Sequence, residues 1–429
     1  MQAIGTRPLH KLSPSFSDPL LASVRMYIYA LPFTYAISMA DGRVTISLLT
    51  SLWLVALLIS RLLRHNLVIP SLMEAFYLFL AFVSLLPLSQ LFTGTVSDKS
   101  LNHLLAYSVS IVGFGLIPML AVANMSRQGW AEVLIRDIMW TARLAALIAV
   151  LQFIGSNFLD FFSEDLIYYP DTIEAKSMFF GIFFRSRGFA AEPGHYAFTL
   201  ELLAPLLLYG HSFRQKKSSL IMVTDLLLML LAFLSVGSPV GLLILGAGFL
   251  LAVLLFPTRH VTPFLWFGLI ALAIALGLVE IVGNQADQLN RFDLLSSLFI
   301  DKLDSTSATD RADRINVGLK LIYEASPLQL LLGYGPAVYV SQKLGEQTII
   351  QFYLLLFLEG GALGMLLFLS GFAFMVAQAI RQLGPGRVFY FWVLINLTLH
   401  YFFISNYYYP MIWFMFPLLL IMQSAQKSR

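Results

Sequence analysis

Two pairs of arginine residues stand beside turns and helix starts, a combination suited to binding an anion. In the first pair, Arg185 and Arg187 precede Gly188, where the backbone can turn sharply or approach a ligand closely. Pro193 then suits the first turn of a helix. The backbone N–H groups at this helix start, with two guanidinium groups just upstream, predict a cradle for an anion.

The second pair lies in the stretch Asp310–Arg314, which predicts a helix that continues to Ala325 and stops at Ser326-Pro327. On such a helix Arg311 and Arg314 share one face, because they are three residues apart. The same helix carries an apolar stripe that predicts packing against the mouth of a bundle, formed by Ile315, Leu319 and Ile322. The turn Gly333-Tyr334-Gly335 follows, and its glycines permit close backbone approach.

Ordinary surface ion pairs offer a second explanation for both clusters. Arg185 and Arg187 can pair with acidic residues of their own loop, and the later helix can be a solvated amphipathic helix with internal salt bridges. The occurrence of two arginine pairs on the same predicted membrane face favours a shared anionic ligand.

Several common catalytic motifs are absent from the sequence. It has no GxxxxGK[ST] phosphate loop and no GxGxxG fingerprint, which argues against ATP and dinucleotides. Its seven His residues form no HExxH motif and there is no Cys, so no zinc site is expected. No DxD-type pair is present to hold Mg²⁺ on a diphosphate. We therefore expect no metal and no cofactor, and arginine as the counter-charge of a diphosphate.

The composition indicates a membrane protein. The 429 residues are 58% hydrophobic and 12% charged, whereas soluble proteins are about 45–50% apolar and about 25% charged. So little charge cannot cover a soluble surface of this size, which excludes a cytosolic enzyme, a disordered chain and a disulfide-stapled secreted domain. The net charge of +3 gives no reason to expect nucleic acid as a partner.

The apolar segments predict an all-α polytopic membrane protein in which residues 1–429 form a single integral membrane domain. A spanning helix needs about 20 apolar residues, and the chain has about twelve such segments. They lie near residues 24–40, 44–62, 67–88, 104–125, 134–156, 196–210, 219–235, 239–257, 263–283, 349–376, 387–404 and 409–424. Lys and Arg in the short connections place both termini in the cytoplasm. Two long loops, 157–195 and 284–348, then lie on the opposite face and hold both arginine pairs.

Ionisable residues inside the predicted spans should be paired, because an unpaired charge is costly there. We predict an interhelical pair between Arg143 and Asp225. His400 lies in an aromatic stretch and is expected to be a satisfied interior residue. Tyr407–Tyr409 is expected to form an aromatic belt at the membrane interface.

The order of these features resembles the Wzy O-antigen polymerases and the related O-antigen ligases. The resemblance covers roughly residues 180–365 and rests on Arg187-Gly188 and Glu192-Pro193, the turn Ser235–Ser238, Arg311, the run Pro327–Gly335, and the E-G-G-x-x-G run Glu359–Gly364. It implies a GT-C-like glycosyltransferase bundle of about 12 transmembrane helices with two long periplasmic loops. It also implies a bacterial inner (cytoplasmic) membrane location, with an active site that faces the periplasm.

By the same resemblance, a growing glycan on undecaprenyl diphosphate is transferred to a lipid-linked repeat unit. We expect Arg187 and Arg311 to clamp the diphosphate, and Glu192 either to accept the acceptor's proton or to orient an arginine. The secondary substrate contacts expected are Arg185, Arg314, His195 and Tyr334. Besides the undecaprenyl-diphosphate-linked donor and acceptor, the partners implied are membrane lipids and a separate chain-length regulator protein.

Two other functions remain open. O-antigen ligases resemble this layout but place a His shortly after the G-x-G turn, and Pro336–Gln351 contains none. This favours a polymerase, although His195 can substitute and keeps the ligase hypothesis open. A transporter of a lipid-linked glycan or organic anion usually has charges near the midplane and repeated halves. No repeat relates residues 1–215 to 216–429.

Overall fold

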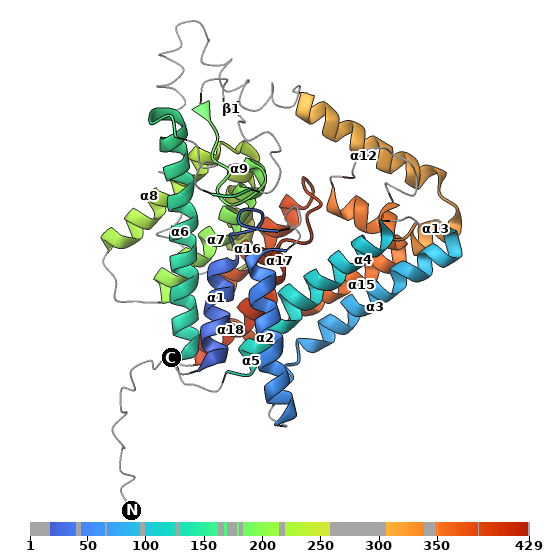
Figure 1. The fold of residues 1–429 in the computed structure, drawn as a ribbon, viewed down its shortest axis with the longest axis horizontal. Helices are drawn as coiled ribbons and strands as arrows, with labels where there is room; N and C mark the ends of the chain where they lie inside the picture. The colour runs from blue at the N-terminus through green and yellow to red at the C-terminus, as the bar shows by residue number, and fades with distance from the viewer. Residues whose placement is uncertain are drawn as a thin grey trace, which may run out of the picture.

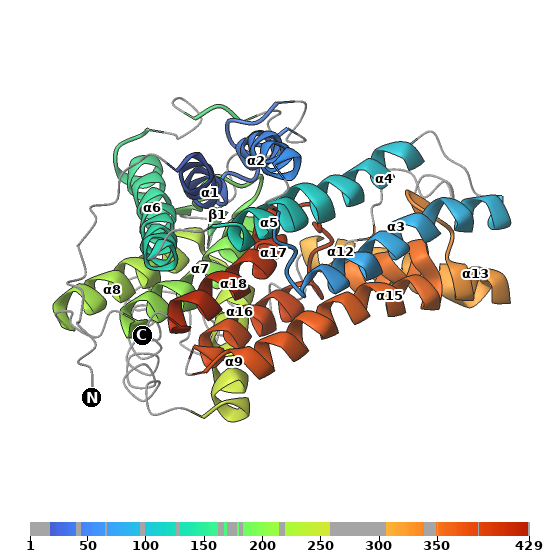
Figure 2. The ribbon, with the colours of Figure 1, turned by 90° about the horizontal axis from the view of Figure 1, so that it is seen from below.

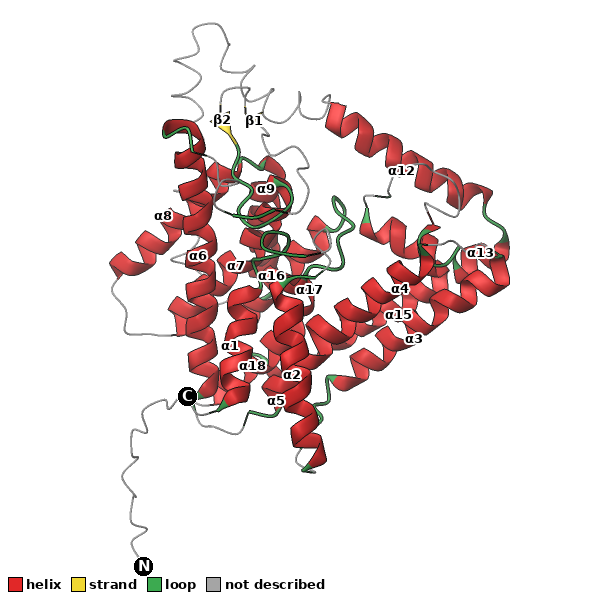
Figure 3. Ribbon diagram, in the orientation of Figure 1, coloured by secondary structure: helices red, strands yellow, loops and turns green. Residues whose placement is uncertain are grey.

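The computed structural model describes residues 18–39, 44–64, 67–94, 99–125, 129–161, 167–169, 178–179, 183–213, 219–257, 306–338, 349, 351–384 and 386–427. In these parts the chain is mostly helical, as the sequence predicts, and its one sheet is a short hairpin (Figure 3).

The N-terminal elements are α1 (Pro19–Ala30), α2 (Ile46–Leu63), α3 (Met73–Thr93), α4 (Ser100–Ser108), the π-helical stretch η1 (Val109–Leu116), α5 (Ile117–Ala123) and α6 (Trp130–Phe158). The hairpin β1 (Met178–Phe179) and β2 (Phe183–Phe184) precedes α7 (Pro193–Phe213), α8 (Ser219–Val236) and α9 (Pro239–Leu255). The C-terminal elements are α12 (Thr306–Glu324), α13 (Pro327–Leu332), α15 (Phe352–Gln382), α16 (Arg387–His400), α17 (Pro410–Trp413) and α18 (Met415–Lys427).

Five helical stretches in the described part of the chain are long and apolar enough to cross a membrane. They are α2, α3, the continuous run from α4 through η1 to α5, α6 and α15. The apolar helices α8 and α9 are shorter. Large apolar side chains on α2 and α3 point outward, and Leu63 and Leu91 are 76% and 75% exposed. Such a surface suits lipid chains and not water, which supports a membrane-embedded protein.

Every predicted apolar segment within the described residues overlaps one of these helices, and the segment 263–283 lies outside them. The first predicted span is nevertheless wrong in extent. Helix α1 begins after Asp18, whose side chain accepts the N–H of Leu20 at 3.0 Å, and it ends at Ala30. Its 12 residues make a helix of about 18 Å, too short for a bilayer core of about 30 Å. Residues 31–39, predicted to continue the span, form turns instead.

The helices form two neighbouring groups (Figures 1 and 2). Helices α1, α6, α7 and α8 lie together with α16 and α18, whereas α3, α4 and α15 run side by side away from them. Helix α13 lies at the far end of α3 and α15, and α12 packs on α15. The two arginine segments of the sequence therefore belong to different groups of helices.

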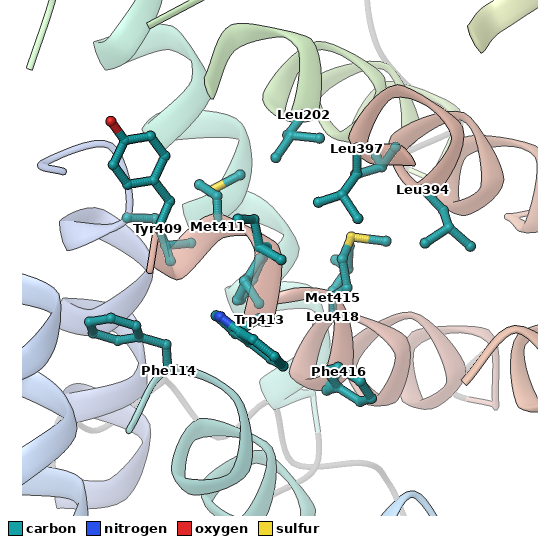
Figure 4. Close-up of a cluster of buried hydrophobic side chains, with 14 of the residues drawn as sticks. Phe114, Leu202, Leu394, Leu397, Tyr409, Met411, Trp413, Met415, Phe416 and Leu418 are labelled. Carbon is teal, nitrogen blue, oxygen red and sulfur yellow. The ribbon is translucent and has the colours of Figure 1, made fainter. Parts of the chain in front are cut away.

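Trp413 in α17 lies in a cluster of buried hydrophobic side chains (Figure 4), and its aromatic contacts join the two groups. Its ring meets Phe79 of α3 at 5.4 Å between centroids and Phe368 of α15 at 6.1 Å, both edge to face. Its indole N–H donates to the Tyr407 carbonyl at 2.7 Å. Aromatic pairs of this geometry add to the burial of large rings, so the cluster fixes the turn 401–409 that precedes α17.

Helix α12 confirms the predicted helix in the second arginine segment, although it begins earlier, at Thr306. Ser326 caps the next helix and Pro327 opens it, as the stop signal indicated. The predicted apolar stripe is only partly right, because Leu319 is 52% exposed. Gly318 faces Leu354 of α15 instead, and Leu321 is buried beside it.

Helix α15 is broken inside the E-G-G-x-x-G run. Gly361 adopts φ 63° and ψ −168°, a conformation open essentially to glycine alone. The break exposes carbonyl groups that the segment after α13 satisfies: Tyr334 N–H donates to Leu358 O at 2.7 Å, and Gly335 N–H donates to Glu359 O at 2.9 Å. A short strand-like contact thus replaces the lost helical hydrogen bonds.

The Glu359 side chain fastens the same contact from the other side. It is fully buried and accepts the Tyr107 hydroxyl and the Ala337 N–H, each at 2.8 Å. His103 Nδ1 lies 3.3 Å from the carboxylate. Buried polar groups are stable only when satisfied in this way, so Glu359 holds the end of the α12–α13 segment on the bundle.

We expect Gly361→Ala to destabilise the protein by about 2 kcal/mol or more, because the left-handed region is costly for alanine. A Cβ at this position would also meet the Gly333 nitrogen and the Leu331 oxygen at 2.4 Å. Thermal unfolding of the detergent-purified protein measures the loss. Gly364→Ala is the matched control, since its Cβ would meet Phe82 at an ordinary 3.4 Å. Equal melting temperatures for the two variants would contradict the assigned strain.

Candidate functional site

Residues 185–189 form a strap across one end of the bundle, directly before α7. The Ser186 N–H donates to Ser235 O at 2.9 Å, and Arg185 Nε donates to Val236 O at 3.0 Å. Both acceptors lie at the end of α8, where a turn leads to Ser238, the N-cap of α9. The predicted Ser-bearing turn therefore lies next to the first arginine pair.

Gln152 of α6 holds the strap by its side-chain amide. Its Oε1 accepts the Gly188 N–H at 2.7 Å and the Ser186 hydroxyl at 2.9 Å, and its Nε2 donates to Gly188 O at 2.8 Å. All these groups are buried, where unsatisfied partners are costly. One side chain thus holds the residues on both sides of Arg187, through the Ser186 hydroxyl and the Gly188 backbone.

Only glycine fits at position 188. Its φ is 54°, and a Cβ would lie 2.0 Å from the ring of Tyr196. The Tyr196 hydroxyl donates to Ala145 O at 2.8 Å, which ties α7 to α6 behind the strap. The sharp turn predicted at Gly188 is present. The ring of Tyr196 lies directly against the backbone at this position.

The guanidinium of Arg187 is buried, with 3% of the residue exposed. It lies over the ring of Tyr169, 3.7 Å from the centroid, and Nη1 is 3.4 Å from the Ala191 carbonyl oxygen that it donates to. A cation on an aromatic face is stabilised by the ring's charge distribution, more so when shielded from water. Arg187 is therefore a fixed positive charge at the base of α7.

The first turn of α7 presents His195 to the turn before α17. Its Nδ1 lies 2.9 Å from the Tyr409 hydroxyl, and its Nε2 lies 3.1 Å from Asn406 Nδ2. Asn406 Nδ2 also donates to the Tyr409 hydroxyl at 3.0 Å. An amide nitrogen only donates, so a neutral imidazole that accepts at Nε2 and carries its proton on Nδ1 suits these contacts.

Tyr409 belongs to the buried aromatic cluster, yet its hydroxyl points away from it (Figure 4). Burial raises the pKa of Tyr409 well above its usual range, and the carboxylate of Glu192 acts in the same direction. The phenol therefore stays protonated, and its oxygen can accept the Nδ1 proton of His195. Glu192 itself is exposed at the start of α7.

The predicted aromatic belt is wrong for two of its three residues. Tyr407 and Tyr409 are 4% exposed and pack inside the protein, whereas Tyr408 between them is 46% exposed. The alternation arises because Tyr407 packs on Tyr107 and Tyr409 packs beside His195, whereas Tyr408 points between them to the outside.

The second arginine segment lies against α15. Arg314 is half-buried on α12, and Arg311 precedes it by one helical turn, with its side chain outside the described residues. Tyr334 is buried, and its hydroxyl donates to Leu321 O at 2.9 Å. Tyr334 thus fastens the turn to α12, and the expected substrate contact stays a prediction.

The structure brings four predicted site residues together around the start of α7: Arg185, Arg187, Glu192 and His195. The other three, Arg311, Arg314 and Tyr334, lie in the group of helices around α15 (Figures 1 and 2). Convergence of Arg187 and Arg311 on one ligand stays a prediction.

Charges inside the bundle are paired across helices. The predicted pair is confirmed: Arg143 meets Asp225 at 2.8 and 2.7 Å, and His211 joins it at 2.6 Å. His400 is an interior residue as expected, and its Nδ1 lies 2.8 Å from Glu201. A further pair between α1 and α6, Arg25 with Asp137 at 2.7 Å, was not predicted.

Compared with known proteins, the chain matches no protein-family model and no curated protein sequence.

We expect Gln152→Ala to loosen the strap, because three buried hydrogen bonds are lost together and each unsatisfied group costs about 1–3 kcal/mol. Limited trypsin digestion should then cut after Arg185 or Arg187, where the wild type is protected. Ser84→Ala is the control, since the Ser84 hydroxyl bonds only within its own helix. Protection as strong as in the wild type would show that Gln152 does not hold the strap.

Proposed function

We propose that the chain is a membrane glycosyltransferase that polymerises a surface glycan. The donor is a growing chain on undecaprenyl diphosphate, and the acceptor is a single lipid-linked repeat unit. By this proposal the start of α7 faces the periplasm of a bacterial inner membrane, and neither metal nor cofactor takes part.

The observation that supports this proposal best is the fixed guanidinium of Arg187. It is buried on Tyr169, and Gln152 pins the backbone beside it. A cation held in place before the reaction stabilises a charge that develops during it, without the cost of reorganisation. A leaving diphosphate is such a charge.

In the proposed reaction an acceptor hydroxyl attacks the anomeric carbon of the donor. The new C–O bond forms as the bond to the phosphate oxygen breaks, and the electron pair leaves with undecaprenyl diphosphate. Arg187 and Arg311 would bind this leaving group more tightly in the transition state than in the ground state. Arg185 and Arg314 are the proposed secondary contacts.

Two groups beside Arg187 can take the acceptor's proton. Glu192 is exposed and free to approach a sugar hydroxyl. A neutral His195 with its proton on Nδ1 suits the observed contacts and leaves a lone pair on Nε2. An acceptor hydroxyl that replaces the Asn406 contact could donate to that nitrogen.

Arg187→Ala should lower the rate of polymerisation about a hundredfold, the usual effect of removing one charge-stabilising donor. In a strain without the native gene, the variant should leave protein in the membrane while the surface glycan stops at single repeats. Gel ladders of the glycan measure this, and Arg311→Ala should act alike.

Lys320→Ala is the control for loss of positive charge in the second loop, because Lys320 is exposed and pairs only loosely with Glu324 at 3.8 Å. It should preserve normal ladders. Full-length ladders in both arginine variants would remove the basis of the proposal.

The pH dependence of the rate separates the two proton acceptors. If His195 is the base, kcat/KM falls as the pH drops through the range where imidazole titrates, about 6.5, because the protonated ring cannot accept. His195→Gln should then abolish this acidic limb and lower the rate at least about a hundredfold. If Glu192→Gln has that effect instead, and His195→Gln keeps the wild-type profile, Glu192 is the base.

In the ligase alternative, His195 takes the place of the histidine that ligases have after the G-x-G turn. Its imidazole is held by Tyr409 and Asn406. A deletion strain distinguishes the two enzymes by what accumulates. Long polymer on undecaprenyl diphosphate, with none on the lipid A core, would identify a ligase. Single lipid-linked repeats would identify a polymerase.

A further inference from the structure

Tyr408 is the one exposed residue of the tyrosine run, and both its neighbours hold it in place. Its ring meets Tyr407 at 5.9 Å and 80° and Tyr409 at 5.2 Å and 79°, edge to face in each case. Tyr407 stacks on Tyr107 at 3.9 Å and 5°, so the turn beneath is rigid. A ring held by such contacts presents an aromatic face that needs no ordering on binding.

The surroundings of Tyr408 are polar and come from three separate segments. Tyr409, whose ring meets that of Tyr408, bonds His195 in the first turn of α7 at 2.9 Å. Burial, together with the charges of Glu192 at the start of α7 and Tyr35 after α1, raises the pKa of Tyr408 to about 12. The residue is still 46% exposed, so its ring remains accessible to a ligand.

Tyr35 is brought there by the same strap that carries Arg187. The N–H groups of Tyr35 and Ala36 both donate to Phe189 O at 3.0 Å. Phe33 stacks on Phe189 at 4.0 Å. Two backbone hydrogen bonds and one ring contact therefore join the segment of Tyr35 to the strap that carries Arg187.

We propose that Tyr408 is a sugar-stacking platform on which a pyranose ring of the lipid-linked glycan lies, with the Glu192 carboxylate accepting hydrogen bonds from its hydroxyl groups. This rests on the proposed function and names a subsite of the same site. One face of a pyranose ring carries C–H groups that pack on an aromatic ring, and its edge carries hydroxyl donors. The exposed ring and the exposed carboxylate beside it match these two requirements.

The subsite is tested with lipid-linked repeat units extracted from the deletion strain. Tyr408→Ala should raise KM about tenfold while kcat changes by less than about twofold, because a stacking contact binds ground and transition states alike. Tyr408→Phe and Tyr408→Trp should retain the wild-type KM, since the aromatic face is kept. Phe402→Ala is the matched control: Phe402 is 48% exposed in the same turn and packs on Tyr353.

Binding is measured separately, with the repeat-unit oligosaccharide released from the lipid by mild acid and titrated calorimetrically. Tyr408→Ala should weaken its binding about tenfold and Phe402→Ala should not. If Tyr408→Ala does not fold, Tyr408→Leu removes the aromatic face at similar volume and is expected to show the same loss.

Each outcome is decisive. The platform is overturned if KM and affinity are unchanged in the Ala or Leu variant, or if Tyr408→Phe shows an equal loss. If the wild type elongates the glycan normally in that case, the proposed polymerase activity is unaffected. If the wild type binds the oligosaccharide through Tyr408 but does not elongate the glycan, the platform is supported and the polymerase proposal is contradicted. Absence of both binding and elongation in the wild type overturns both.

Discussion

Burial of the Arg187 guanidinium is the constraint on which the candidate site depends. A buried charge is tolerated only where its surroundings compensate for the lost water. Here the Tyr169 face and the Ala191 carbonyl contribute to that compensation. Neither would stay in place if the strap could move, and Gln152 is the side chain that stops it from moving. The cation and its amide anchor are therefore one structural unit contributed by α6 and the segment before α7.

The turn 401–409 links this unit to the other group of helices. Trp413 anchors the turn in the core by its bond to Tyr407 O, and Tyr407 in turn stacks on Tyr107. Tyr107 bonds Glu359 at the break in α15, while Tyr409 bonds His195. One short turn thus contacts the α7 start directly, and Tyr107 and Glu359 connect it to the segment that follows α13.

The sequence is informative wherever a signal is local. Long apolar runs predict the helices, and Ser326-Pro327 predicts the end of α12 because caps act within one turn. The pair Arg143–Asp225 follows from the cost of isolated charge in a membrane. Helix α1 was overextended because composition alone does not show that residues 31–39 bond to the strap. The regular spacing of apolar residues predicts that Leu319 faces the bundle. The prediction fails because Gly318, which has no side chain, allows α12 to approach Leu354 of α15 at that position instead.

The residues that complete the site carry no such local signal. Gln152 is one polar residue in an apolar helix, and its partners lie 34 and 36 positions away. Asn406 and Tyr409 are separated from His195 by more than 200 positions. Such contacts follow from helix packing, which a single sequence does not encode in readable form. A general clue did exist: amides inside apolar helices need partners, as charges do.

The pairing of the interior charges bears on the choice between an enzyme and a transporter. A transporter needs charged groups that exchange partners near the midplane as cargo moves. In this bundle Arg25, Arg143 and Glu201 already have close partners on neighbouring helices, at 2.7–2.8 Å. Breaking a buried pair leaves an uncompensated charge, at a cost of about 3–5 kcal/mol. These charges therefore serve helix packing and are not available to exchange partners with a moving cargo. The pairing supports the proposed enzyme over the transporter alternative.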